Sequence, residues 1–309
     1  MVRRFKRDYD GYTVENVAFE SLPGFFVTGN LYYPNPLKEG SQYPALLCPH
    51  GHFATPNGGG RFTPDMQKLC ATIARMGGFA FSYDMVGWGE SQQYPHAGKV
   101  LALQLWDSMR GVDFLLSLKQ VDPKRIGITG ASGGGTQTFL LAAVDDRIAL
   151  SIPVVMVAAH VSGGCVCESG MPIRKGDNFE TNNAEIAAMA APRPQLIISD
   201  GSDWTKNTPS VEYPYIKHVY ALFGAESQVE NLHLPTEGHD YGYSKRVGTY
   251  KFLEKHFGMS LAGIAKSDGS IDETPAIVEK KQAMLVFPPD IPKDAVYGEE
   301  DVEHLIWPK

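Results

Sequence analysis

Residues 126–144 read IGITGASGGGTQTFLLAAV, and this stretch decides the fold. The apolar run at 126–129 predicts a buried strand, and the run at 136–144 predicts a helix. The turn between them, GASGG at 130–134, sets a serine between glycines that let a strand and a helix approach closely. This strand–turn–helix context predicts that Ser132 is a nucleophile held on a sharp elbow.

A phosphate-binding loop is the rival interpretation of the same glycines. Such a loop ends in Gly-Lys followed by Ser or Thr, and residues 130–138 contain no lysine. We therefore favour the nucleophile. A serine hydroxyl attacks poorly near neutral pH, so this interpretation requires a base and an orienting acid elsewhere in the chain.

Around this elbow, short apolar runs alternate with longer amphipathic stretches from about residue 44 to residue 257. The alternation predicts parallel strands joined by helical crossovers in a doubly wound, mostly parallel sheet of the α/β class. Residues 13–20 and 24–33 instead predict a pair of antiparallel strands that precede the parallel part. The expected strands of the parallel part are 44–48, 78–83, 126–129, 150–156, 195–199 and 229–234, and the expected helices include 66–76, 100–118 and 136–144.

The two ends of the chain differ from this pattern. We expect residues 1–258 to form a catalytic domain and residues 259–309 to form a C-terminal extension. The extension holds one clear apolar run, at 284–287, and so few apolar residues cannot bury a core alone. We therefore expect it to pack on the main domain. The first seven residues form a basic run, for which we expect a solvated terminus.

Composition excludes several classes of partner. The formal net charge of −7 leaves no basic excess to neutralise phosphates, so we expect no nucleic-acid partner. No apolar stretch reaches the roughly 18 residues of a membrane span, so we expect no membrane partner. Asp8, Asp10 and Glu15 interrupt the region where a signal peptide would be apolar. We expect a cytoplasmic location, or a secreted or periplasmic one if a signal peptide was removed. The sequence leaves open whether the protein forms a homo-oligomer.

The partners of the serine should follow it in the chain order Ser, acid, His. His239 lies in a loop just beyond the apolar run at 229–234, where a base can reach over the sheet edge. Asp203 follows the strand at 195–199 after a short turn and is the expected acid, with Asp200 as its rival. We expect structural roles for the histidines that lie within strand or helix patterns, which are His233, His218 and His256.

A tetrahedral intermediate needs fixed hydrogen-bond donors for its oxyanion. The amide of Gly133, directly after the nucleophile, is the first expected donor. The second is the amide of His52 or Phe53, in the loop after the strand at 44–48. His50 and His52 could alternatively form a metal pair, but no carboxylate or thiol cluster accompanies them in the sequence. We therefore expect no metal and no organic cofactor.

Taken together, these residues resemble the branch of α/β-hydrolases that contains acetyl xylan esterases and cephalosporin-C deacetylases, near the dienelactone-hydrolase-like proteins. The resemblance covers about residues 20–257, and it rests on His50-Gly51, DMVGWGES at 84–91, the elbow, Asp203 and His239. In that branch the D-x-x-G-x-G-x-S stretch shapes a loop beside the site. The resemblance therefore implies structural roles for Asp84 and Ser91.

The same resemblance implies hydrolysis of short acyl esters, with acetylated sugars as the first substrate class to test. It extends to bacterial acetyl xylan esterase-like proteins, which share a segment similar to GGCVCE at 163–168. One departure bears on the substrate rather than on the reaction. The deacetylases carry a shorter, differently patterned segment after the strand at 150–156.

The segment at 157–183 leaves the carboxyl end of a central strand, so we expect it to form part of the wall over Ser132. Cys165 and Cys167 are expected to pack there as small apolar groups. A redox or metal role, or a disulfide to one of the other cysteines, is the alternative. Those other cysteines, both expected to be buried thiols, are Cys48 and Cys70.

Three aromatic residues are expected on loops at the catalytic edge of the sheet: Trp88, Trp204 and Tyr83. Their rings could stack on a sugar or aryl ring of the substrate. The alternative, which the sequence leaves open, is that they only pack the loops.

The resulting hypothesis is a serine esterase that forms an acyl-enzyme on Ser132 and hydrolyses a short acyl ester, such as an acetyl ester, of a small molecule or oligosaccharide. Another hydrolase activity is the alternative: a lactonase, a glucuronoyl or methyl esterase, or a peptidase. A non-catalytic binding scaffold is a third hypothesis. A chain-length series of esters separates the first two, and labelling by a fluorophosphonate probe tests the third.

Overall fold

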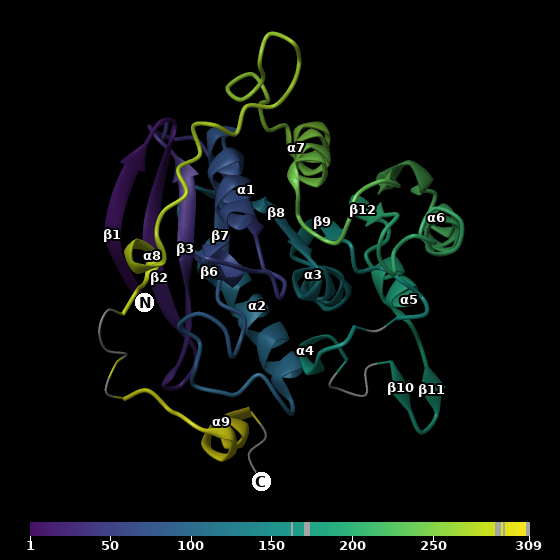
Figure 1. The fold of residues 1–309 in the computed structure, drawn as a ribbon, viewed down its shortest axis with the longest axis horizontal. Helices are drawn as coiled ribbons and strands as arrows, with labels where there is room; N and C mark the ends of the chain where they lie inside the picture. The colour runs from purple at the N-terminus through teal and green to yellow at the C-terminus, as the bar shows by residue number, and fades with distance from the viewer. Residues whose placement is uncertain (162, 170–173, 288–291, 293, 307–309) are drawn as a thin grey trace.

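The computed structural model describes residues 1–161, 163–169, 174–287, 292 and 294–306. These residues build a nine-stranded sheet with helices on both faces (Figure 1). The sheet is antiparallel from β1 through β2 and β3 to β7, and parallel from β7 through β4, β8, β9 and β12 to β13. The predicted doubly wound sheet with antiparallel N-terminal strands is confirmed. Its strands are β1 (Val2–Tyr9), β2 (Tyr12–Leu22), β3 (Phe25–Pro34), β4 (Tyr43–Leu47), β7 (Phe79–Tyr83), β8 (Val121–Ala131), β9 (Ile148–Val154), β12 (Gln195–Asp200) and β13 (Val229–Leu234).

The core lies on both faces of this sheet because successive side chains of a strand point to opposite faces. On β4, Leu46 packs in the cluster that includes α1 and α7, whereas Leu47 packs in the cluster that includes α2. The predicted helices at 66–76, 100–118 and 136–144 are confirmed as α1, α2 and α3. The main helices are α1 (Pro64–Arg75), α2 (Val100–Leu116), α3 (Gly133–Val144), α5 (Asn183–Ala188), α6 (Glu212–Leu222) and α7 (Tyr243–Phe257).

The winding of the chain reverses between β4 and β8. From β4 the chain crosses through α1 to β7 on one side, and from β8 it crosses through α3 to β9 on the other. The carboxyl ends of two such neighbouring strands open into a crevice, where ligands bind in open α/β sheets. The loop after β4 and the turn after β8 therefore meet at the place where this topology favours a site.

The N-terminal basic run has mostly exposed side chains, as expected of a solvated terminus, but its backbone forms an edge strand that the sequence did not predict. β1 pairs antiparallel with β2, while most of its side chains are exposed. Strand pairing uses backbone groups, and exposed charged side chains are a common feature of edge strands. Arg3 follows this pattern, because its Nε donates to Glu15 Oε2 of β2 over 2.6 Å.

The C-terminal segment lies against the antiparallel strands and continues to the bottom of the view in Figure 1. Its apolar run is buried at Met284, Val286 and Phe287. The carboxylate of Glu90 accepts hydrogen bonds from the amides of Val286 and Phe287, and Arg61 Nη1 donates to Met284 O over 2.9 Å. The division of the chain at residue 258 stays a prediction. The helices of this segment are α8 (Lys281–Met284) and α9 (Glu299–Ile306).

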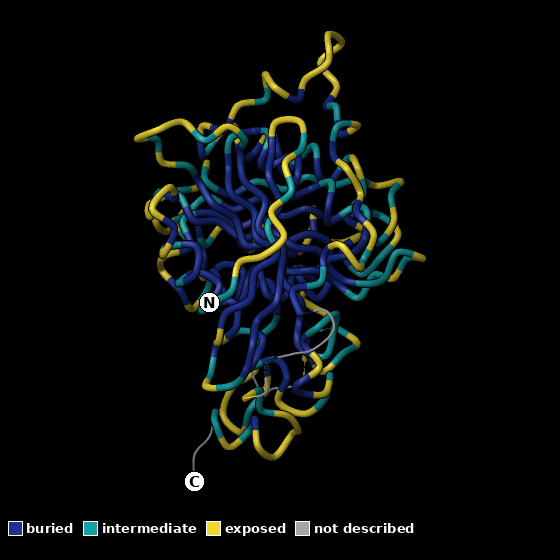
Figure 2. The backbone as a smooth tube through the Cα atoms, turned by 90° about the vertical axis from the view of Figure 1, so that its left-hand side faces the viewer, coloured by how far each residue is buried: buried dark blue, intermediate teal, exposed yellow. Residues whose placement is uncertain are grey.

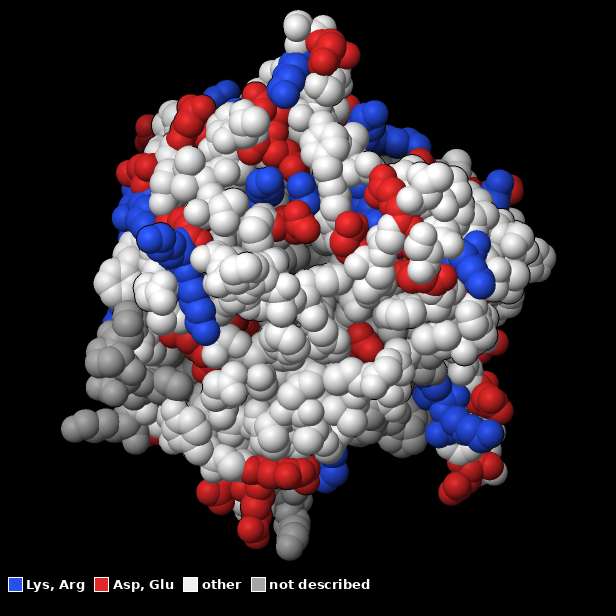
Figure 3. Space-filling view, in the orientation of Figure 1, with Lys and Arg blue, Asp and Glu red and all other residues white. Residues whose placement is uncertain are grey.

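Exposed residues are concentrated in the loops and in the edge strand β1, while the inner strands of the sheet are almost entirely buried (Figure 2). On the face drawn in Figure 3, lysine and arginine are interspersed with aspartate and glutamate. The acidic group at the bottom of that view includes the first turn of α9, with Glu299, Glu300 and Asp301. Within the described ranges, no helix combines the length and the apolar character needed to cross a membrane.

Candidate active site

Ser132 stands between the end of β8 and the start of α3, in the predicted elbow. Its backbone angles are φ 57° and ψ −122°, a strained conformation that L-residues rarely adopt outside functional sites. The flanking glycines make this turn possible. A Cβ added at Gly130 or Gly134 would lie 2.4 Å or 2.2 Å from Pro49 O, closer than any real contact. The elbow therefore packs directly on the loop that follows β4.

His239 and Asp203 meet at the same edge of the sheet, each in the loop after a parallel strand. The Nδ1 atom of His239 donates to Asp203 Oδ2 over 2.6 Å. The other carboxylate oxygen of Asp203 accepts from both the amide and the hydroxyl of Thr205. Burial on its own raises the pKa of Asp203, but the hydrogen bonds from His239 and Thr205 outweigh it and lower the pKa. This carboxylate is therefore anionic and oriented toward the imidazole.

The rival acid, Asp200, makes different contacts. Its carboxylate accepts from the amide of Ser202 and lies 3.6 Å from Lys245 Nζ, and both charged side chains are fully buried. Burial and the negative charge of Asp203 raise the pKa of Asp200. Since Asp203 makes the hydrogen bond to His239, the geometry favours Asp203 as the orienting acid.

The loop after β4 runs against the elbow, as an oxyanion hole requires. A Cβ added at Gly51 would lie 2.9 Å from the Cβ of Ser132. Gly133 is the first residue of α3, so its amide has no acceptor within the helix. In the part of the chain that the structure describes, the amides of His52 and Phe53 donate to no other protein group. These amides thus stay available on the two loops that meet at Ser132.

Of the three aromatic residues expected at the substrate, Tyr83 is placed elsewhere. Tyr83 ends β7 with 1% of its surface exposed, and its hydroxyl shares a 2.7 Å hydrogen bond with Ser108. The expectation that Tyr83 reaches a substrate is wrong, because the end of this strand points the ring into the core. Trp204 packs on His239, with ring centroids 4.4 Å apart. Trp88 packs on His52 and on His96, at 5.4 Å and 6.1 Å.

His50 and Asp84 have structural surroundings. His50 is buried, its Nδ1 donates to Gly51 O over 2.9 Å, and its Nε2 accepts from the amide of Met85 over 3.1 Å. Burial lowers the pKa of His50 to about 4, so the ring is neutral. Asp84 forms a fully buried ion pair with Arg61, with 2.8 Å between Oδ1 and Nε. With both of its nitrogens satisfied, His50 does not form the metal pair with His52 that the sequence left as an alternative.

Glu168 is a residue of the site that the sequence did not single out for a role. It lies in α4 (Val166–Ser169) with 4% of its surface exposed. A Cβ added at Gly133 would lie 3.3 Å from both Glu168 Oε1 and the ring of His52. Burial raises the pKa of Glu168, while backbone hydrogen bonds at Cys165 and Gly164 act in the opposite direction. The segment GGCVCE at 163–168 thus borders the elbow, as the expected wall does; residues 162 and 170–173 of that wall lie outside the described residues.

The four cysteines are free thiols, and Cys48 and Cys70 are fully buried, as expected. Cys165 and Cys167 have polar partners instead of purely apolar ones. Cys167 Sγ lies 3.0 Å from His52 Nε2, and Cys165 Sγ lies 2.9 Å from His96 Nε2. The premise that no thiol accompanies His52 is therefore wrong. These contacts join residues 115 and 69 positions apart, a distance over which sequence spacing carries no signal.

Comparison with known proteins finds similarity to several esterases. A model of the fungal glucuronyl esterase family matches residues 89–167, which include Ser132. Methylesterase BT1017 is 40% identical, with a TM-score of 0.86, over 94% of this chain and 64% of that protein. The 4-O-methyl-glucuronoyl methylesterase of Neurospora crassa is 39% identical over 141 residues, 35% of each protein. The chain thus spans less than two thirds of the length of either enzyme.

The acetyl xylan esterase from Paenibacillus sp. R4 is a more distant neighbour. It is 19% identical, with a TM-score of 0.55, over 82% of this chain and 88% of that one. At this identity the likeness concerns the fold alone. The predicted α/β-hydrolase fold is confirmed by these structural neighbours.

Proposed function

We propose that this chain, an α/β-hydrolase of the esterase branch, hydrolyses carbohydrate esters through an acyl-enzyme on Ser132. The observation that carries the proposal is the strained elbow at Ser132 on the sheet edge that also holds the 2.6 Å His239–Asp203 hydrogen bond. A serine on such an elbow needs a neutral imidazole as its base and an anionic acid that fixes the tautomer. Asp203, whose pKa is lowered, is the anionic acid of this arrangement.

The chemistry follows from these positions. With Nδ1–H bound to Asp203, His239 presents an unprotonated Nε2, which accepts the proton of the Ser132 hydroxyl as Oγ adds to the ester carbonyl. The amide of Gly133, together with that of His52 or Phe53, stabilises the negative oxygen. The protonated His239 then gives its proton to the leaving alcohol. Water, deprotonated by His239, releases the acid and restores Ser132.

Two ester types fit this mechanism, and they differ in which half carries the sugar. In an acetylated sugar the acyl group is small and the sugar leaves. In a methyl ester of a uronic acid the sugar forms the acyl-enzyme and methanol leaves. The sequence favours the acetyl ester, whereas the 40% identity to a methylesterase over 94% of this chain favours the methyl ester as a second candidate.

The nucleophile is tested with Ser132→Ala and a matched control, Ser227→Ala, at an exposed serine of a short helical turn away from the proposed site. We expect Ser132→Ala to lose labelling by a fluorophosphonate probe and hydrolysis of nitrophenyl acetate. The control should keep both, and both variants should keep the wild-type circular dichroism. Labelling of the folded Ser132→Ala protein, or no labelling of the wild type, would contradict the proposal.

The substrate class is tested by measuring two products side by side. Methanol released from methyl glucuronate and acetate released from acetylated xylan give kcat/KM for each ester type. A preference for the methyl ester supports the second candidate, and a preference for the acetylated sugar supports the first. An enzyme that hydrolyses neither, yet cleaves lactones or peptides, would reject carbohydrate esters while keeping the serine mechanism.

A further inference from the structure

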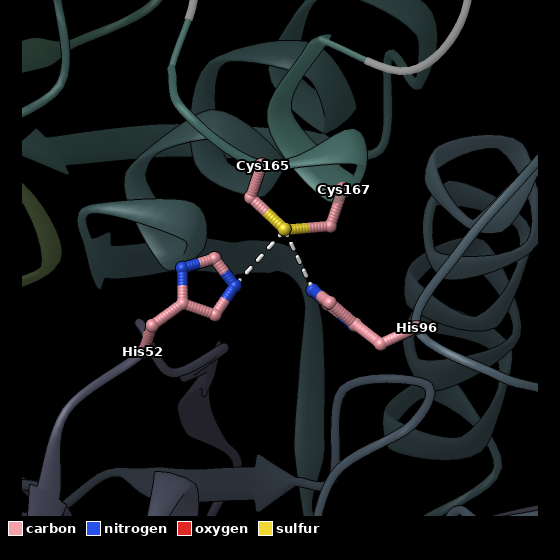
Figure 4. Close-up of side chains that lie close together, drawn as sticks. All are labelled: His52, His96, Cys165 and Cys167. Atoms are coloured by element: carbon pink, nitrogen blue, oxygen red, sulfur yellow. Dashed lines mark hydrogen bonds between the residues drawn. The ribbon is translucent and has the colours of Figure 1, made fainter.

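Four side chains from distant parts of the sequence point at one another beside the elbow (Figure 4). The potential ligand atoms all lie within 4.8 Å of one another. They come from three loops at the carboxyl edge of the sheet: the loop after β4, the loop between β7 and α2, and the segment at α4. The four residues are His52, His96, Cys165 and Cys167.

The spacing of these atoms is close to that of a tetrahedral zinc site. Zinc binds Cys sulfur at about 2.3 Å and His nitrogen at about 2.0–2.1 Å, so the edges of the tetrahedron measure roughly 3.3–3.8 Å. The two contacts between sulfur and nitrogen, at 2.9 Å and 3.0 Å, are slightly shorter, and every other separation is below 4.8 Å. Small side-chain rotations would therefore bring all four atoms onto one ion.

Each histidine is also oriented as a ligand. His96 Nδ1 donates to Val86 O over 2.8 Å, which leaves Nε2 without a proton and aimed at Cys165. His52 Nδ1 faces the buried carboxylate of Glu168 at 3.7 Å, while its Nε2 faces Cys167. A carbonyl or carboxylate behind the second ring nitrogen is the usual outer support of a metal-bound histidine.

We propose that His52, His96, Cys165 and Cys167 bind one Zn²⁺ ion, which clamps the three loops together. Two thiolates and two imidazoles form a donor set that zinc prefers, and four protein ligands close the site. Binding releases the two thiol protons to water, because the ligands are thiolates. The two negative sulfurs then neutralise the ion, so the half-buried complex carries no net charge.

The position of the ion would tie it to the oxyanion loop. His52 is itself one of the proposed oxyanion residues, so a ligand bond to its side chain would hold its backbone in place. Gly87 lets the loop between β7 and α2 fold back on itself and present His96, since a Cβ at Gly87 would lie 2.6 Å from His96 Cβ. The proposed zinc site is inferred from the arrangement of its four ligands, so it does not require that the protein is an esterase.

The proposal is tested on the full chain, purified under reductant, loaded with Zn²⁺ and dialysed exhaustively. We expect about one zinc per chain by elemental analysis, and a higher melting temperature than after removal of the metal by a chelator. With Co²⁺ in place of zinc, the wild type should show the intense visible bands of a tetrahedral ion and thiolate charge-transfer absorption. The exposed-histidine variant His160→Asn is the matched control and should retain the metal.

The ligand variants are His96→Asn and Cys165→Ser, both at partly exposed positions. We expect at least a tenfold lower affinity for Co²⁺ in each, with loss of the tetrahedral spectrum. A wild type that retains no metal after dialysis would overturn the proposal, and so would a ligand variant with the wild-type spectrum. Should a variant fail to fold, the wild-type metal content and spectrum decide alone. An octahedral cobalt spectrum in the wild type would also reject the site.

Discussion

The imidazole of His239 and the carboxylate of Asp203 share a 2.6 Å hydrogen bond between Nδ1 and Oδ2. A second carboxylate, Asp200, lies only three residues away but is turned toward Lys245. Asp200 ends β12 and Asp203 lies in the loop that follows, and their pKa values are shifted in opposite directions, lowered for Asp203 and raised for Asp200. Two neighbouring acids with such different surroundings offer a matched pair of variants.

The first prediction compares Asp203→Asn with Asp200→Asn. An asparagine at 203 cannot hold the imidazole in the correct tautomer, so we expect kcat for nitrophenyl acetate to fall by about 10³–10⁴-fold. At 200 the same change leaves the bond to His239 intact, and Lys245 keeps its 2.7 Å contact with Asp240. We expect kcat of that variant to stay within about tenfold. The reverse order of the two effects would reassign the acid.

The residues that sequence alone could place are those with a local signal. The elbow at Ser132 combines an apolar run, a glycine turn and a helix within residues 126–144, and the structure reproduces each of them. Asp203 and His239 were located by strand order, because the carboxyl ends of parallel strands share one edge of the sheet. Their catalytic roles stay a prediction until the variants are measured.

The residues that sequence could not place depend on long-range contacts. Nothing in the spacing of His96 and Cys165 signals their 2.9 Å contact. His50 and His52 look like a pair in the sequence, yet His50 bonds to the amide of Met85, whereas His52 faces Cys167. The sequence did not predict the edge strand β1, because its side chains are charged and its pairing with β2 is made by backbone groups alone.

The second prediction concerns the buried cation that connects the C-terminal segment to the loop beside the site. Arg61 is fully buried and contacts Asp84 at 2.8 Å and Glu90 at 2.7 Å. Arg61→Met would leave both carboxylates without their cation, so we expect a loss of about 3–5 kcal/mol in the free energy of unfolding. Urea denaturation measures this loss.

The control for this change is Arg3→Met. Arg3 also pairs with a carboxylate, that of Glu15, but 37% of its side chain is exposed. An exposed pair contributes little, so we expect a change within about 1 kcal/mol. Equal destabilisation by the two variants would contradict the prediction, because the buried ion pairs of Arg61 would then stabilise the fold no more than the exposed pair of Arg3.

The third prediction concerns a buried acid on α2. Asp107 has 2% of its surface exposed, and burial raises its pKa to about 7, although Ser21 acts in the opposite direction. The unfolded chain has a pKa of about 3.9 at this position, so between about pH 4 and pH 7 the folded state binds more protons. The contribution of Asp107 to stability is therefore fully present below about pH 4 and is lost as the pH rises to 7.

Asp107→Asn cannot ionise and should not share this loss. We expect the unfolding free energy of the variant, relative to the wild type, to rise between pH 4 and pH 7 by at most about 4 kcal/mol, then level off. Thermal unfolding at a series of pH values measures the difference in stability between the two proteins. Because only the change of this difference with pH is used, any pH-independent effect of the asparagine on stability cancels. Parallel curves for the two proteins would mean that Asp107 does not titrate in this range.

The last prediction distinguishes a packing role from a binding role at Trp204. The centroid of its ring lies 4.4 Å from that of His239, the proposed base, so a substitution here tests both roles. If the ring also stacks on a sugar, Trp204→Leu should raise KM for a carbohydrate ester several-fold more than KM for nitrophenyl acetate. Trp204→Phe, which keeps an aromatic face, should restore most of the difference. If the ring only packs on His239, Trp204→Leu should lower kcat equally for both substrates and leave the ratio of their KM values unchanged. That result would assign Trp204 a packing role alone.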